Sequence, residues 1–111
     1  MKTRTLGKTG LKVSEIGLGT WALGTSIYGD VEKGAPRRLI GQAMDAGINF
    51  FDTAPLYGTT EEVGTAETIL GEALGERRSS VLISTKFGRT STRVTPGRFT
   101  AEEAIASCDA S

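Results

Sequence analysis

Three short apolar runs recur along the chain about every 33 residues, which is close to the length of a strand–helix–strand unit. The runs cover residues 13–18, 48–51 and 81–85. Each is rich in β-branched or aromatic residues and is bounded by Gly, Asp or Ser, as buried strands commonly are. We therefore predict three buried strands at these positions.

Helical patterns fill the gaps between the runs. Pro36 suits the first turn of a helix, because its missing N–H would have no partner there, and Gly47 suits a left-handed cap. Thr59-x-x-Glu62 and Thr100-x-x-Glu103 predict capping boxes that begin two further helices. The predicted apolar faces contain Leu39, Ile40, Ala43 and Met44; then Val63, Ala66, Leu70, Ala73 and Leu74, with a stop at Gly75; then Ala104, Ile105 and a buried Cys108. This alternation predicts an α/β fold with a parallel sheet and right-handed crossovers.

The first residues follow a different pattern. Residues 2–6 and 11–13 flank the turn-forming sequence Gly7-Lys8-Thr9-Gly10, which predicts a β-hairpin. Residues 88–97 contain Thr, Ser, Pro and Arg without apolar periodicity, so we expect them to be the most flexible stretch.

The composition excludes several kinds of protein. Thirteen Lys and Arg residues balance thirteen Asp and Glu residues, whereas a nucleic-acid-binding protein commonly has a basic surplus. The apolar runs are far shorter than the roughly 20 residues of a membrane span, and we identify no signal peptide. Because the chain has one Cys and no His, it holds neither a Cys/His zinc site nor a Ser-His-Asp triad. The lone cysteine favours a reducing, cytoplasmic location.

Chemically useful side chains follow all three predicted strands, and functional groups of parallel α/β folds gather at the carboxyl ends of strands. The first run is followed by Gly19, Thr20 and Trp21, the second by Asp52 and, five residues later, Tyr57, and the third by Lys86. We therefore expect a carboxylate, a phenol, an ammonium and an indole to meet at one edge of the sheet.

Asp52 and Lys86 directly follow buried strands, where an unpaired charge is costly, so we expect them to pair. A phenol, with a reference pKa of about 10, is a poor proton donor near neutrality, and a neighbouring ammonium favours its ionised form. Tyr57, Lys86 and Asp52 therefore suit proton transfer to or from a carbonyl oxygen. A structural ion pair beside a half-buried loop tyrosine is the alternative for the same residues.

Two nucleotide-binding motifs are matched only in part. Gly17-x-Gly19 follows a predicted strand, but Ala22 stands at the third glycine position of a dinucleotide fingerprint and no helix follows directly. Since Ala is tolerated there, a Rossmann fold stays open as an alternative. Gly7-Lys8-Thr9 resembles the end of a phosphate-binding loop, but Lys2 stands at its first glycine position and no strand precedes it.

The segment from Gly47 to Gly58, together with Glu67 and Gly71 in the next predicted helix, closely resembles the signature of the aldo-keto reductases. Residues 6–14, 17–21 and 83–86 resemble the same family, so the resemblance covers essentially the whole chain. It implies a (β/α)8 TIM barrel. Residues 1–13 would be a hairpin that plugs its amino-terminal end, and residues 14–111 would be its first three β/α units.

The resemblance also implies reversible, NADPH-dependent reduction of aldehydes and ketones, without a metal. Tyr57 would be the general acid, Lys86 its activator and Asp52 the residue that orients Lys86. The cofactor would contact Gly19, Thr20, Trp21 and Asp52, and the substrate Trp21 and Tyr57.

The sequence also departs from the family pattern. A (β/α)8 barrel takes about 250 residues, and the family's catalytic His at the end of the fourth strand has no counterpart in a sequence without His. We therefore expect an amino-terminal part of a reductase that is inactive alone. The alternatives are a non-enzymatic binding or regulatory subunit of the same family, and copies that associate through unpaired sheet edges.

Overall fold

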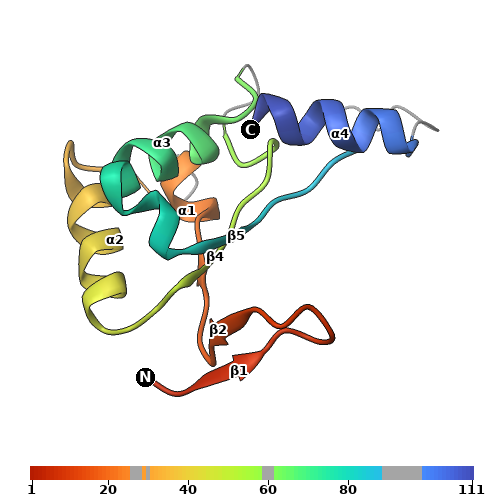
Figure 1. Cartoon of the computed structure of the whole chain (residues 1–111). Helices are drawn as coiled ribbons and strands as arrows, with labels where there is room; N and C mark the ends of the chain where they lie inside the picture. Colours follow the sequence, from red (N-terminus) through yellow and green to blue (C-terminus); the bar gives the residue numbers. More distant parts are fainter. Residues whose placement is uncertain (26–28, 30, 59–61, 89–98) are drawn as a thin grey trace.

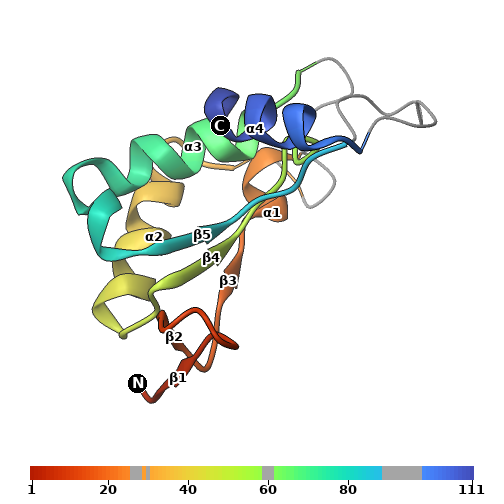
Figure 2. The same ribbon diagram turned by 45° about the vertical axis from the view of Figure 1, so that its right-hand side comes forward.

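The computed structural model describes residues 1–25, 29, 31–58, 62–88 and 99–111. Its strands are β1 (Thr3–Thr5), β2 (Lys12–Ser14), β3 (Leu18–Gly19), β4 (Phe50–Asp52) and β5 (Leu82–Ser84). Its helices are α1 (Trp21–Gly24), α2 (Ala35–Asp45), α3 (Thr65–Leu74), the 3₁₀ helix η2 (Gly75–Ser80) and α4 (Ala101–Ala110). Strands β3, β4 and β5 form a parallel sheet in this order, and α2 and α3 lie against one another beside it (Figures 1 and 2).

The sheet separates an apolar row of side chains from a polar one. Leu18, Phe51 and Ile83 are in register, and Phe51 is fully buried in the core against α2 and α3. The next register row contains Gly19, Asp52 and Ser84. Because successive side chains of a strand point to opposite faces, this second row faces away from the helices.

The predicted hairpin is confirmed, with β1 and β2 paired antiparallel. It lies at the end of the sheet where the parallel strands begin (Figure 2). Asn49 attaches it there: Ser14 N–H donates to Asn49 Oδ1 over 2.7 Å, and Asn49 Nδ2 donates to the Lys12 carbonyl over 2.9 Å. The Asn49 N–H also donates to the Ser14 hydroxyl, over 3.1 Å, so this residue, which precedes β4, joins the hairpin to the sheet through both its backbone and its side chain.

The prediction of one strand over residues 13–18 is wrong in its extent. Val13 and Ser14 belong to β2, and β3 contains only Leu18 and Gly19. The Ser14 hydroxyl donates to the Ile16 carbonyl over 2.7 Å and bends the chain between the two strands. The two later strands form where predicted, within three residues each.

The first predicted helix is confirmed as α2, which begins with Pro36 in its first turn. Gly47 has φ +90° and donates to the Met44 carbonyl, while Ile48 donates to the Ala43 carbonyl, both over 2.9 Å. This pair of hydrogen bonds is a Schellman motif, which a left-handed glycine permits.

The second helix begins later than predicted. Its cap is Gly64 with φ 82°, so Glu62 lies outside α3, and Val63 is 56% exposed instead of buried. Gly64 N–H donates to the Pro55 carbonyl over 2.7 Å, and this contact holds the start of α3 against the loop after β4. Thr59 lies outside the described residues.

The third helix, α4, begins at the predicted cap, where Thr100 accepts a 3.2 Å hydrogen bond from Glu103 N–H. The prediction that Cys108 is buried is wrong: Cys108 is exposed, and Ile105 is 63% exposed. The reason is that α4 lies beyond the end of the sheet, not over the face that α2 and α3 occupy (Figure 1).

The stretch predicted to be flexible falls mainly on residues 89–98, outside the described residues. Among the described helices, none combines the length and apolar character needed to cross a bilayer.

Candidate functional site

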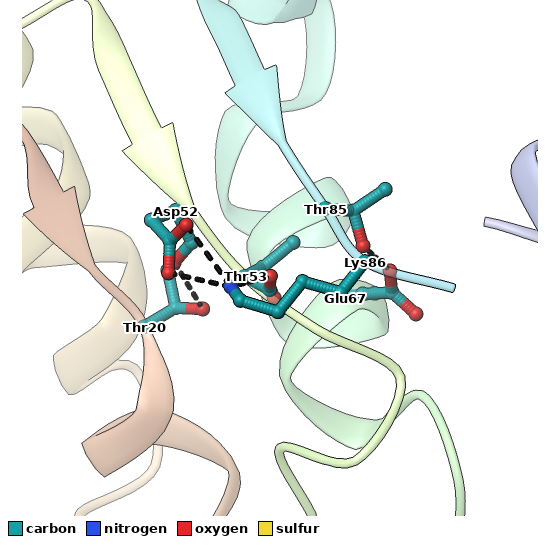
Figure 3. Close-up of polar contacts among 6 residues, drawn as sticks. All are labelled: Thr20, Asp52, Thr53, Glu67, Thr85 and Lys86. Carbon is teal, nitrogen blue, oxygen red and sulfur yellow. Dashed lines mark hydrogen bonds and ion pairs between the residues drawn. The ribbon is translucent and has the colours of Figure 1, made fainter. Parts of the chain in front are cut away.

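Asp52 and Lys86 form the predicted pair at the carboxyl ends of β4 and β5. The Lys86 ammonium donates to both Asp52 carboxylate oxygens, over 2.8 and 3.0 Å, and to the Thr53 carbonyl over 2.8 Å (Figure 3). An ammonium has three donors, so these acceptors fix its position. Both side chains stay accessible, since Lys86 is 48% and Asp52 44% exposed.

Three threonines follow the strands at equivalent positions, one residue beyond the row of Gly19, Asp52 and Ser84. Thr20 is fully buried, and both its N–H and its hydroxyl donate to the Asp52 carbonyl, over 2.9 and 3.2 Å. Thr53 N–H donates to the Ser84 carbonyl over 2.8 Å. Thr20 thus fixes the backbone of Asp52, and Thr53 joins β4 to β5 beside Lys86.

Tyr57 and Trp21 complete the group of residues predicted to meet at this edge. The Lys86 ammonium lies 4.9 Å from the centre of the Tyr57 ring, which is a cation–π distance. The Trp21 and Tyr57 rings are 6.4 Å apart and tilted by 40°, and Trp21 is 46% exposed. The structure therefore brings an indole, a phenol, an ammonium and a carboxylate together, as the sequence predicts.

The backbone of Tyr57 is held between two helices. Its carbonyl accepts a 2.8 Å hydrogen bond from Ala66 N–H at the start of α3. On the other side it packs against Gly24 of α1, where a Cβ would overlap the Tyr57 carbonyl and come within 2.9 Å of the Ala66 Cβ. The absence of a side chain at Gly24 therefore lets α1, which also carries Trp21, approach Tyr57.

We expect Gly24→Ala to lower the free energy of unfolding by about 1–3 kcal/mol, as is typical of overpacking. Gly41→Ala in α2 is the matched control, because a Cβ there meets no atom within 4 Å. Alanine is the better helix former, so this control is expected to be neutral or stabilising. Urea denaturation of both variants measures the difference, and equal stabilities would contradict the close approach at Gly24.

The ionisation of Lys86 reflects two opposing influences. Burial lowers the pKa of Lys86, but hydrogen bonding and charge from Asp52 and Tyr57 outweigh it, so its pKa is raised above 10.5. The amine is therefore an ammonium throughout the neutral range. It can hold Asp52 in place and offer a positive charge to a phenol that loses its proton.

The raised pKa predicts the pH range over which the ion pair stabilises the chain. A group with a raised folded-state pKa contributes its full stabilisation below its unfolded pKa of 10.5 and loses it as pH rises through the folded value. We therefore expect the stability difference between the natural chain and Lys86→Met to be constant from pH 6 to 9 and to shrink above pH 10.5. Urea denaturation at pH 6, 7, 9 and 11 measures it, and a difference that varies between pH 6 and 9 would contradict the assigned pairing.

The roles of Thr53 and Thr85 at this site were not predicted from the sequence. The Thr53 carbonyl accepts from Lys86, and the Thr85 hydroxyl donates to Glu67 of α3 (Figure 3). A signal for Thr85 exists in the strand alternation, since it falls on the face that packs against helices. A hydrogen-bond partner lowers the cost of burying a hydroxyl on that face, and Glu67 is the acidic residue in the first turn of α3.

Comparison with known proteins supplies the family. The Aldo/keto reductase family profile matches residues 15–111. Pyridoxal 4-dehydrogenase of Microbacterium luteolum is 42% identical over 95 residues, covering 86% of this chain and 26% of that protein. L-galactose dehydrogenase of Arabidopsis thaliana is 42% identical over 92 residues, covering 80% of this chain and 27% of that protein. The chain thus spans about a quarter of the length of these curated relatives.

Solved structures agree with the sequence relatives. A Pseudomonas aeruginosa protein described as an aldo-keto reductase superposes with a TM-score of 0.76 at 34% identity, over 97% of this chain and 39% of that one. Glycerol dehydrogenase of Gluconobacter oxydans superposes with a TM-score of 0.61 at 37% identity, over 78% of this chain and 25% of that one. The expected TIM-barrel class is confirmed, and the described strands form an open part of such a barrel. The chain belongs to the aldo/keto reductase family, whose named members among these relatives are oxidoreductases.

Proposed function

We propose that this chain supplies the proton-transfer site of an NADPH-dependent reductase that interconverts carbonyl compounds and alcohols. The observation that carries the proposal is the Lys86 ammonium, which binds the Asp52 carboxylate and lies against the Tyr57 ring. This arrangement pairs a phenol with a fixed positive charge at the accessible edge of the sheet. The substrate class is a small aldehyde or ketone.

The residues proposed to hold the nicotinamide cofactor are Gly19, Thr20, Trp21 and Asp52. Gly19 is exposed, and the space where a Cβ would lie is open, so a flat group can approach the end of β3. Trp21 offers a partly exposed indole beside it. The buried Thr20 side chain acts through Asp52, whose carbonyl it binds. These features suit a planar ring, which on binding would supply the hydride.

In the proposed reduction, the Tyr57 hydroxyl donates its proton to the carbonyl oxygen of the substrate. Lys86 stabilises the phenolate that is left, because its ammonium already lies against the ring. Asp52 holds Lys86 in place and keeps it charged, so its part is orientation. The reverse direction uses the same groups, with the phenolate accepting the proton of an alcohol.

The chain spans only part of its relatives, so the properties of a complete reductase are also proposals. We propose that residues 1–13 form the plug and residues 14–111 the first three β/α units of a barrel, and that the protein is cytoplasmic. The 111 residues alone would be catalytically inert, since they contain no His for the family's fourth catalytic position. Copies could also pair through the outer strands β3 and β5. Sedimentation tests this pairing, and a compact monomer would exclude it.

A chimaeric enzyme tests the proposed activity. Residues 1–111 replace the matching part of pyridoxal 4-dehydrogenase, to which the chain is 42% identical over 95 residues. We expect the chimaera to oxidise pyridoxal with a nicotinamide cofactor, because Tyr57, Lys86 and Asp52 would come from this chain and the rest of the barrel from the dehydrogenase. A folded chimaera that binds cofactor but does not turn over would contradict the assignment.

Fluorescence titration of the 111-residue chain with NADPH separates the catalytic proposal from a binding or regulatory subunit. An inert part of a reductase is expected to show no saturable binding at micromolar concentrations. Saturable binding by the chain, combined with an inactive chimaera, would favour the binding subunit.

A further inference from the structure

Glu67 connects three separate parts of the chain at one carboxylate oxygen. It lies in the first turns of α3, and its Oε1 accepts from the Thr85 hydroxyl just after β5. The same oxygen accepts a 3.0 Å hydrogen bond from the Ser111 hydroxyl at the end of α4. The contact with Thr85 is made by partly buried groups and the contact with Ser111 by exposed ones, so water competes less with the Thr85 hydrogen bond.

Thr85 lies at the point where the sheet stops restraining the chain. The register between β4 and β5 ends with Asp52 opposite Ser84, and Thr53 N–H donates to the Ser84 carbonyl over 2.8 Å. The next residue, Thr85, turns its side chain toward α3, and Lys86 turns back toward Asp52 (Figure 3). A hydrogen bond from the Thr85 side chain therefore fixes the backbone immediately before Lys86.

Lys86 depends on that backbone position because its side chain must cross from β5 to β4. Its ammonium reaches Asp52 and the Thr53 carbonyl together, within 2.8–3.0 Å of each acceptor. A small displacement of the Lys86 backbone would lengthen all these contacts, and hydrogen bonds weaken quickly beyond such distances.

We propose that Glu67, acting through the Thr85 hydroxyl, is a positioning residue for Lys86. The purpose of this positioning rests on the proposed function, since it would keep the ammonium against the Tyr57 ring. The contact itself does not depend on that function. Within the part of the chain that the structure describes, no hydrogen bond or ion pair joins Glu67 to Asp52 or Tyr57, so its effect passes through Thr85.

Competitive acylation of the 111-residue chain with acetic anhydride, read by mass spectrometry, tests the proposal. The rate at Lys86 is compared with that at the exposed Lys33 in the same sample. In Thr85→Val and Glu67→Met, Lys86 loses part of its contact with Asp52, so its pKa is expected to fall and more of the amine is unprotonated at pH 8. The relative acylation rate at pH 8 then rises about threefold in each variant.

Conservative and neighbouring variants separate positioning from general structure. Thr85→Ser and Glu67→Gln keep a donor and an acceptor, so both are expected to acylate like the natural chain. Ser111→Ala removes the other hydrogen bond to the same carboxylate oxygen and is expected to leave Lys86 unchanged. The double variant Thr85→Val/Glu67→Met is expected to equal either single variant, because both remove one interaction.

An unchanged Lys86 rate in folded Thr85→Val or Glu67→Met would overturn the proposal. An equal rise in the Lys86 acylation rate of Ser111→Ala would also overturn it. Loss of the fold in both single variants would overturn it too, because the Thr85–Glu67 contact would then support the fold as a whole. If only one single variant folds, that variant decides. The assay uses neither cofactor nor substrate, so an inactive chimaera would leave its result intact.

Discussion

Tyr57→Phe in the pyridoxal 4-dehydrogenase chimaera is expected to lower turnover by about 10²–10⁴-fold, the usual contribution of a positioned proton donor. The substitution removes one hydroxyl and keeps the ring, so the contact with the Lys86 ammonium at 4.9 Å and the packing against Trp21 persist. The loss is expected in turnover, with cofactor affinity nearly unchanged. Initial rates at saturating cofactor, with a cofactor titration beside them, measure both quantities.

Tyr28→Phe, at the only other tyrosine of the sequence, is the control and is expected to retain turnover. Turnover of Tyr57→Phe within threefold of the parent chimaera would remove Tyr57 as the proton donor. A loss caused by weaker cofactor binding alone would instead assign Tyr57 to the binding surface.

Lys86→Met is expected to lower turnover by about 10²-fold, because the phenolate would form without its neighbouring positive charge. The fold should survive, since the Lys86–Asp52 pair is about half exposed and such pairs contribute only about 0–1 kcal/mol to stability. Steady-state rates and urea denaturation of the same preparation measure the two effects separately.

Lys33→Met is the matched control, because it removes a different exposed lysine by the same substitution. It is expected to change neither turnover nor stability. A Lys86→Met chimaera that keeps its turnover would make the Asp52–Lys86 contact a structural ion pair, which is the alternative that the sequence left open.

Much of this site follows from the sequence because parallel strands deliver their last residues to one edge. The apolar runs predict β4 and β5 to within a few residues, so the pairing of Asp52 with Lys86 follows from the sequence. The position of Tyr57 does not follow from the strand pattern alone, since Tyr57 lies in a loop that contacts with Gly24 and Ala66 hold in place.

What sequence reasoning missed depends on tertiary contacts. The bend at Ser14 divided a continuous apolar run between two sheets, and Asn49 joined them through an amide that no periodicity indicates. Helix α3 begins later than predicted because the Gly64 N–H donates to the Pro55 carbonyl. Cys108 is exposed because burial depends on where α4 lies, which the apolar spacing of the helix does not indicate.

The double variant Tyr57→Phe/Lys86→Met in the chimaera tests most directly whether phenol and ammonium act as one unit. If Lys86 serves only to stabilise the Tyr57 phenolate, its removal costs nothing more once the hydroxyl is gone, so the double variant should turn over like Tyr57→Phe alone. Losses that multiply across the two substitutions would show that the two residues act independently and would contradict the proposed site.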